Sequence, residues 1–321
     1  MKRLIVNADD YGLTRGVNRG IVEAHRRGIV TSTSWLANGA AFEPGLELAR
    51  QHPQLESGVH LNLTQGRPIA PAEAVASLTG RDGRFAYAAA RLGWAMLRGR
   101  VRAAEIEIEL RAQIQKLIAA GIEPVHLDGH QHIHVLPGVA PAVIRLAREF
   151  GIRRVRSPWE RATASGLQAE AAFPRAPARR RQWLVARAVA HYARGFEARL
   201  DAAGLIHPAR FYGIRHTGRL DTAALRGLLT NLPEGDAELM CHPGYADDEL
   251  RGAGTRLQAS RELELQALTS AEAKDELERQ QIRLIGAREL ERGGGRAAPR
   301  WTEHTAGAAA APGLGGGSIR E

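Results

Sequence analysis

The sequence predicts an α/β protein built around a parallel sheet or barrel, and three observations support that fold class. Short apolar runs alternate with segments of helical periodicity along most of the chain, which is typical of parallel strands joined by helices. Several of these runs end directly in acidic or histidine residues, as buried strands do when one edge of the sheet carries a site. The 321 residues, 44% of them hydrophobic, are enough for a substantial core.

Each expected strand is a short run of apolar or β-branched residues bounded by Gly, Pro, Asn or charged residues. The expected strands cover residues 4–6, 30–36, 58–63, 124–127, 153–157, 209–214, 237–241 and 282–285. In the third of them, strand alternation places His60 and Asn62 on the same face.

The helices between the strands are indicated by apolar residues spaced three and four apart and by capping residues. Thr14 can cap the first helix and Gly28 can end it, whereas Thr269 and Glu272 form a capping box before the last. The expected helices cover residues 14–27, 44–52, 86–97, 101–120, 141–150, 176–203, 222–232 and 269–279. Residues 64–82 lack periodicity and are expected to form a long loop.

Composition changes sharply near the end of the chain. From residue 293 onward Gly, Ala, Pro and Ser dominate, and such a segment cannot bury enough apolar surface to order itself. We therefore expect one domain over residues 1–292 and a disordered tail over residues 293–321.

The formal net charge is +9, and Arg residues concentrate between residues 145 and 219. One hypothesis is that this basic region faces nucleic acid or an anionic membrane surface. However, the Arg residues of 175–199 are interleaved with Ala, Val and Leu at helical spacing, and no nucleic-acid-binding motif accompanies them. We therefore expect solvated helices and no nucleic-acid partner.

Nothing in the sequence indicates an oxidising compartment or a membrane. Cys241 is the single cysteine, which excludes an intrachain disulfide. The first residues lack the apolar stretch of a signal peptide, and no stretch approaches the ~20 apolar residues of a transmembrane segment. A soluble cytoplasmic protein is the expectation.

Asp9 and Asp10 stand side by side at the end of the first expected strand. Adjacent carboxylates repel each other unless a metal ion or a shared proton offsets the repulsion. This pair therefore indicates a site at the carboxyl end of the strand.

A run of histidines follows the fourth expected strand. If the chain stays extended, alternate residues lie on one side, namely His126, Asp128, His130, His132 and His134. A cluster of this density favours a metal or active site over a structural role.

The acidic pair, His60 and His130 follow three different strands, whose carboxyl ends converge on one site in a parallel α/β fold. One carboxylate with two imidazoles, leaving open positions, suits a catalytic divalent metal ion. The second carboxylate is then free to act as a base.

Five stretches together resemble the YdjC family of carbohydrate deacetylases, in the same order along the chain. They are residues 5–13, 30–34, 58–64, 126–134 and 241–244. The resemblance implies a distorted (β/α) barrel related to the polysaccharide deacetylases, with one divalent metal ion, Mg²⁺ or Zn²⁺, bound by Asp10, His60 and His130. It further implies removal of the N-acetyl group from an N-acetylglucosamine-type sugar, either a chitooligosaccharide or a glycolipid head group.

Amide hydrolysis needs a polarised carbonyl, an activated water and a proton for the departing amine. Asp9 is the candidate general base, and Arg156 is a candidate to orient Asp9 or to bind substrate. His242, before Pro243 and Gly244, is a candidate proton donor or oxyanion partner.

The remaining polar residues are candidates to fix the ligands or to line the sugar site. His126 and Asp128 are expected to hold the imidazole ligands, and His132 and His134 to contact sugar or to assist as an acid. Asn62 shares the face of His60 and belongs to the same group.

Two alternatives stay open at this stage. A metal-dependent phosphoesterase on a barrel would use similar Asp and His clusters but would want more ligands, usually for two metal ions. A non-enzymatic protein would use the basic middle for nucleic acid or membrane binding. Oligomeric state is open as well, with a homodimer among the options.

Overall fold

The computed structural model describes residues 1–161 and 177–290, with the side chains of 177–182 left out. Within these residues one parallel sheet contains eight strands. The strands are β1 (Lys2–Tyr11), β2 (Ser32–Trp35), β3 (Glu56–Leu61), β4 (His126–Gly129), β5 (Arg154–Val155), β6 (Arg210–Tyr212), β7 (Gly235–Cys241) and β8 (Ile282–Leu284). The expected parallel α/β architecture is confirmed.

Strand β1 lies in the middle of the sheet, whose order is β5-β4-β3-β2-β1-β7-β6, and β8 pairs with the start of β1. The two ends of this order approach each other, because an isolated parallel bridge joins Arg154 of β5 to Ile206, shortly before β6. The sheet is therefore curled into the distorted barrel that the sequence analysis expected.

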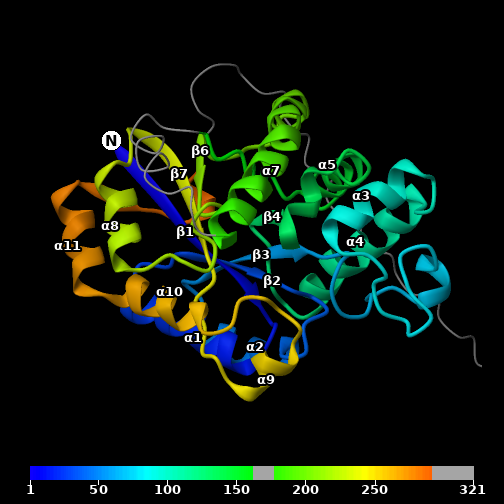
Figure 1. Cartoon of the computed structure of the whole chain (residues 1–321), viewed down its shortest axis with the longest axis horizontal. Helices are drawn as coiled ribbons and strands as arrows, with labels where there is room; N and C mark the ends of the chain where they lie inside the picture. The colour runs from blue at the N-terminus through cyan, green and yellow to red at the C-terminus, as the bar shows by residue number, and fades with distance from the viewer. Residues whose placement is uncertain (162–176, 291–321) are drawn as a thin grey trace, which may run out of the picture.

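Helices surround the sheet (Figure 1), with α8 and α11 at the left of the view and α3 and α4 at the right. They are α1 (Arg15–Arg27), α2 (Phe42–Gln51), α3 (Ala89–Leu97), α4 (Ala103–Ala119), α5 (Ala140–Glu149), α7 (Pro177–Ala202), α8 (Thr222–Thr230), α9 (Asp248–Gly252), α10 (Ser260–Thr269) and α11 (Ala271–Arg279). Three short 3-10 helices are η1 (Ala72–Val75), η2 (His130–Val135) and η3 (Ala287–Glu289).

Amphipathic helices pack against the curled sheet and share its core. In α1 the Thr14 side chain accepts a hydrogen bond from the Val17 N–H, as a capping residue should, and Val17 and Ile21 are fully buried. The expected Arg-rich helix is present as α7. Among the described helices, none combines the length and the apolar character that crossing a bilayer requires.

Helices α9 and α10 were not expected from the sequence, because α9 has only 5 residues and because Glu and Leu alternate at the start of α10, which is a strand-like period. The expected cap at Thr269 was also wrong. Thr269 is the last residue of α10 and its hydroxyl bonds the Leu265 carbonyl, whereas the Ser270 side chain accepts from the Ala273 N–H at the start of α11. Because only Ser270 separates α10 from α11, the sequence pattern alone does not show which residue caps the second helix.

The histidine run does not stay extended as assumed. After Gly129 the chain turns into η2, and Gln131 and His132 adopt left-handed backbone angles with φ of 53° and 57°. Strand alternation therefore ends at Gly129, and His132 and His134 do not follow the side-chain direction of His126 and Asp128. The expected tail, residues 293–321, lies outside the described residues.

Replacing Gly20 by Ala should destabilise the protein, because the new Cβ would lie 2.5 Å from the Cα of Gly244. Overpacking against backbone costs about 1–3 kcal/mol, which exceeds the roughly 1 kcal/mol that Ala gains over Gly within a helix. Gly227→Ala is the matched control in α8, where a Cβ would meet nothing within 4 Å. Urea unfolding should show Gly20→Ala less stable and Gly227→Ala slightly more stable than the parent; equal stabilities would contradict the close packing of α1 on residue 244.

Candidate active site

The carboxyl end of β1 is irregular, and this irregularity brings Asp9 and Asp10 to one site. Adjacent residues of a regular strand point to opposite faces. Here the register between β1 and β2 shifts between Ala8 and Tyr11, and Asp10 has a φ of 74°. Both carboxylates consequently approach the same nitrogen, His60 Nε2, with Oδ2 of Asp9 at 3.9 Å and Oδ1 of Asp10 at 3.6 Å.

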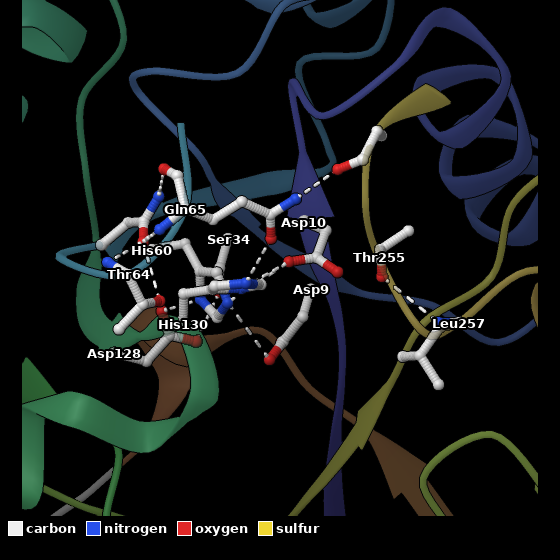
Figure 2. A network of polar contacts seen from close by, with 12 residues as sticks. Asp9, Asp10, Ser34, His60, Thr64, Gln65, Asp128, His130, Thr255 and Leu257 are labelled. Atoms are coloured by element: carbon white, nitrogen blue, oxygen red, sulfur yellow. Dashed lines mark hydrogen bonds and ion pairs between the residues drawn. The ribbon is translucent and has the colours of Figure 1, made fainter. Parts of the chain in front are cut away.

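Asp10, His60 and His130 form a group whose ligand atoms lie within 4.8 Å of one another (Figure 2). Oδ1 of Asp10 is 3.0 Å from Nδ1 of His130, yet among the described residues this buried oxygen has no hydrogen-bond partner. An orphaned carboxylate oxygen facing two imidazole nitrogens fits a divalent cation, because all three atoms are ligand types that Zn²⁺ accepts. The donor set therefore fits the metal site expected from the sequence.

His60 is oriented by Asp128, whose Oδ1 lies 2.7 Å from His60 Nδ1. Because that nitrogen donates its hydrogen to Asp128, Nε2 is the nitrogen left toward the acidic pair. Burial alone would lower the pKa of His60, but Asp128, Asp9 and Asp10 raise it to about 9. Without a metal ion a proton on His60 thus takes the place of a cation among these carboxylates.

Arg156 is completely buried and ties three carboxylates together. Its Nη1 and Nη2 donate to the two oxygens of Asp9 at 2.7 and 2.8 Å, and its Nε donates to Glu238 at 2.6 Å. Nη1 also lies 2.8 Å from Oδ2 of Asp128. Of the two functions considered for Arg156, its contacts are those of a residue that orients Asp9.

A second acidic group that could hold a metal ion consists of Asp9, His60 and Asp128. The guanidinium of Arg156 already lies between Asp9 and Asp128, and His60 Nδ1 is bonded to Asp128. A second cation at this place would face the positive charge of Arg156 at close range. The described residues therefore provide one plausible metal centre rather than two.

Arg261, at the start of α10, was missed by the sequence analysis. It is fully buried and its Nη2 donates to Oδ2 of Asp10 at 2.5 Å. Burial would raise the pKa of Asp10, but Arg261 and the neighbouring His130 and His60 hold it well below its usual value. The sequence offered no signal, because Arg261 lies in an unpredicted helix among many other Arg residues.

His242 directly follows β7, beside the end of β1, where Cys241 pairs with Ala8. Its backbone N–H donates to Glu264 at 2.6 Å, and its Nδ1 is 3.9 Å from the same carboxylate. Burial lowers the pKa of His242 to about 4 and raises that of Glu264 to about 7. Glu264 is a further residue that sequence reasoning missed.

His126 and Ser34 continue the network below His60. The Ser34 hydroxyl donates to Oδ2 of Asp128 at 2.6 Å and lies 3.1 Å from Nε2 of His126. The side-chain amide of Asn7 joins it by donating to Asp9 at 2.9 Å and to Ser34 at 2.8 Å. His126 is thus within the hydrogen-bonded group around Asp128 rather than beside the candidate ligands.

His132, His134 and Asn62 each make contacts outside the group of candidate ligands. His134 Nε2 is 3.1 Å from the backbone oxygen of Arg156. The His132 ring packs edge-on against Phe211 and is almost fully buried. Asn62 uses its side chain to build the turn after β3, accepting from Thr64 N–H at 2.9 Å.

Comparison with known protein families and structures identifies relatives of this chain. The family model described as YdjC-like protein matches residues 3–279. The chain belongs to the YdjC-like family. A carbohydrate deacetylase of Brevibacillus brevis is 36% identical over 288 residues, covering 90% of this chain and 99% of that protein.

Other YdjC-like relatives carry related names. The carbohydrate deacetylase of Homo sapiens is 38% identical, over 76% of this chain and 75% of its own length. The chitooligosaccharide deacetylase of Klebsiella pneumoniae is 35% identical, over 84% of this chain and 92% of its own length. A crystal structure from Enterococcus faecalis V583, described as a proposed cellobiose-phosphate cleavage protein, superposes with a TM-score of 0.70 and 28% identity over 89% of this chain and 98% of that one.

Asp10→Asn should lose the metal ion, whereas Asp9→Asn should keep it. Asp10 offers the orphaned oxygen to the candidate site, but Asp9 is committed to Arg156. After loading with Zn²⁺ and dialysis, elemental analysis should find about one ion per chain in the parent, as a single site requires. A content near two, or equal loss in both variants, would contradict this assignment.

The metal-free protein should lose stability as the pH rises from about 6.5 to about 9. His60 has a raised pKa, so its contribution is complete below pH 6.5 and is lost as the pH passes through 9. Glu238 and Glu264, whose pKa values are raised from 4.5 to about 7, also lower the stability as the pH rises, but over the earlier window from about 4.5 to 7. Calorimetry with a chelator present should show that the Tm falls as the pH rises, and that it falls less steeply in His60→Gln than in the parent. A Tm of the parent that does not change with pH would contradict the raised pKa of His60.

Proposed function

We propose that the protein is a metal-dependent hydrolase that removes the N-acetyl group from an N-acetylglucosamine-type sugar, in a chitooligosaccharide or a glycolipid head group. The observation that carries the proposal is the separation of the acidic pair, with Asp10 facing His60 and His130 and Asp9 held by Arg156. The names of the relatives, carbohydrate deacetylase and chitooligosaccharide deacetylase, support the same reaction.

Asp10, His60 and His130 would hold the divalent ion, either Mg²⁺ or Zn²⁺. When bound there, the ion would polarise the acetyl carbonyl and lower the pKa of the attacking water. These three residues supply three ligand atoms, so the ion would keep further coordination positions open for water and substrate.

Asp9 would act as the general base. Arg156 and Asn7 fix its carboxylate, but each carboxylate oxygen has two lone pairs, so Oδ2 can still accept a proton. That oxygen lies 3.9 Å from His60 Nε2, at the edge of the ligand group. A water proton transferred to Asp9 is then available to the amine nitrogen when the C–N bond breaks and acetate leaves.

His242 would support the developing negative charge on the acetyl oxygen. With a pKa of about 4 its imidazole is neutral near pH 7, so it donates a hydrogen bond more readily than a proton. Glu264 holds the backbone of His242 and thereby the position of its ring.

The phosphoesterase hypothesis is not favoured by any observation of this site. Two-metal phosphate chemistry needs a second cation near the first, and Arg156 lies at the second acidic group of the described residues. A cytoplasmic location and a homodimer stay predictions from the sequence.

Purified, Zn²⁺-loaded protein should release acetate from N-acetylated oligosaccharides or glycolipids, and a chelator should abolish the release. Asp9→Asn should lower kcat at least about 100-fold, because a positioned general base contributes 10²- to 10⁴-fold. Asp248→Asn is the control, since Asp248 pairs with Arg251 at the surface. Acetate is measured by a coupled assay or by NMR.

Full turnover by Asp9→Asn would remove Asp9 from the base position. Absence of acetate release from every N-acetylated saccharide and glycolipid in such a screen, with the metal ion bound, would contradict the proposed reaction.

A further inference from the structure

Gln65 connects the candidate metal ligand His130 to a distant loop. Its Oε1 lies 3.0 Å from His130 Nε2, and its Nε2 donates to the carbonyl of Ala253 at 2.7 Å. Figure 2 shows the Gln65 side chain beside His130, with a dashed line between the two. Ala253 follows α9, so the contact joins the loop after β3 to the segment between β7 and α10.

The backbone around Gln65 is fixed by Asn62, which is almost fully buried. The Asn62 side-chain oxygen accepts from the N–H groups of Thr64 and Gln65 at 2.9 and 3.1 Å. Its side-chain amide donates to the Gln65 carbonyl at 2.8 Å and to Asn38 Oδ1 at 3.0 Å. The turn therefore presents the Gln65 side chain in one place.

The partners of Gln65 determine which way its amide points. The Ala253 carbonyl can only accept, so the NH₂ group must face it and the oxygen must face His130. An oxygen in that position requires the hydrogen of a neutral His130 to be on Nε2. The lone pair of His130 is then on Nδ1, which lies 3.0 Å from Oδ1 of Asp10.

Two acceptor atoms 3.0 Å apart repel each other unless a cation lies near both. The orientation of Gln65 therefore prepares His130 for a metal ion. We propose that Gln65 is a positioning residue, which holds His130 in the tautomer that presents Nδ1 to the ion and anchors that ligand to the loop at Ala253. This inference rests on the metal site of the proposed function and adds to it a residue outside the ligand set.

The segment that receives Gln65 also reaches a second ligand. Arg261 lies eight residues after Ala253, at the start of α10, and bonds Asp10. One stretch of chain thus supports two of the three candidate ligands, His130 through Gln65 and Asp10 through Arg261. Arg261 holds Asp10 in place but its positive charge also repels a bound cation, so a substitution there would change metal affinity in two opposite ways. Gln65 is neutral, and a substitution of Gln65 avoids this ambiguity.

The test compares Gln65→Met, Gln65→Glu and the control Gln51→Met in the full chain. Met removes both hydrogen bonds, Glu keeps an acceptor toward His130 but loses the donor to Ala253, and Gln51 is an exposed amide that contacts Glu47. Two readouts are used: the Nε2–H signal of His130 in the Zn²⁺-loaded protein, assigned with His130→Gln, and the Kd for Zn²⁺ by calorimetry.

The parent and Gln51→Met should show an Nε2–H signal that the hydrogen bond to Gln65 protects from exchange with water, and Gln65→Met should lose this protection. Loss of such a partner typically weakens metal binding 10- to 100-fold, so Gln65→Met should raise the Kd by about that factor. Gln65→Glu should restore the Kd to within about threefold of the parent, because a carboxylate accepts from the same imidazole N–H at least as well as an amide does.

Parent-like protection of the Nε2–H and a parent-like Kd in Gln65→Met would overturn the proposal, as would equal weakening in the Met and Glu variants or a parent protein that binds no Zn²⁺. These readouts do not require turnover. If the parent binds Zn²⁺ but releases no acetate, the proposed reaction fails, while the positioning function of Gln65 is still decided by the exchange protection of the His130 Nε2–H and by the affinity for Zn²⁺.

Discussion

The site depends on how its buried negative charges are compensated, and Arg156 supplies most of the compensation. Inside the barrel it contacts Asp9, Asp128 and Glu238, with no exposure to solvent. Removing a partner from such a buried cluster leaves uncompensated charge and commonly costs about 3–5 kcal/mol. The position of Arg156, next to β5, therefore decides which carboxylates can face the centre of the site.

Adjacent carboxylates at the end of β1 are tolerated because each has a guanidinium of its own. Asp9 is bonded to Arg156 from within the barrel, and Asp10 to Arg261 from α10. The two partners draw the carboxylates apart and leave one oxygen, Oδ1 of Asp10, toward the imidazoles of His60 and His130. The chemistry proposed for the site follows from this division.

The strands and the convergence of the ligands were predictable because they depend on local patterns and on a general property of parallel sheets. Apolar runs that end in Asp9, His60 and the histidine run place those residues at one edge, and the structure brings Asp10, His60 and His130 together there. Arg261 and Glu264 were not predictable, since they reach the site from a helix that is remote in sequence and was not expected. Gln65 lies close to His60 in sequence but in a loop without periodicity. The turn at His132 also escaped, because left-handed backbone at a non-Gly residue has no composition signal of its own.

The most direct test of this account is a crystal structure of the full chain with Zn²⁺, with the ion located by its anomalous scattering. The account predicts one ion contacting Oδ1 of Asp10, Nε2 of His60 and Nδ1 of His130, with Asp9 still bonded through both oxygens to Arg156. An ion between Asp9 and Asp128, or an Arg156 side chain displaced from Asp9, would contradict it.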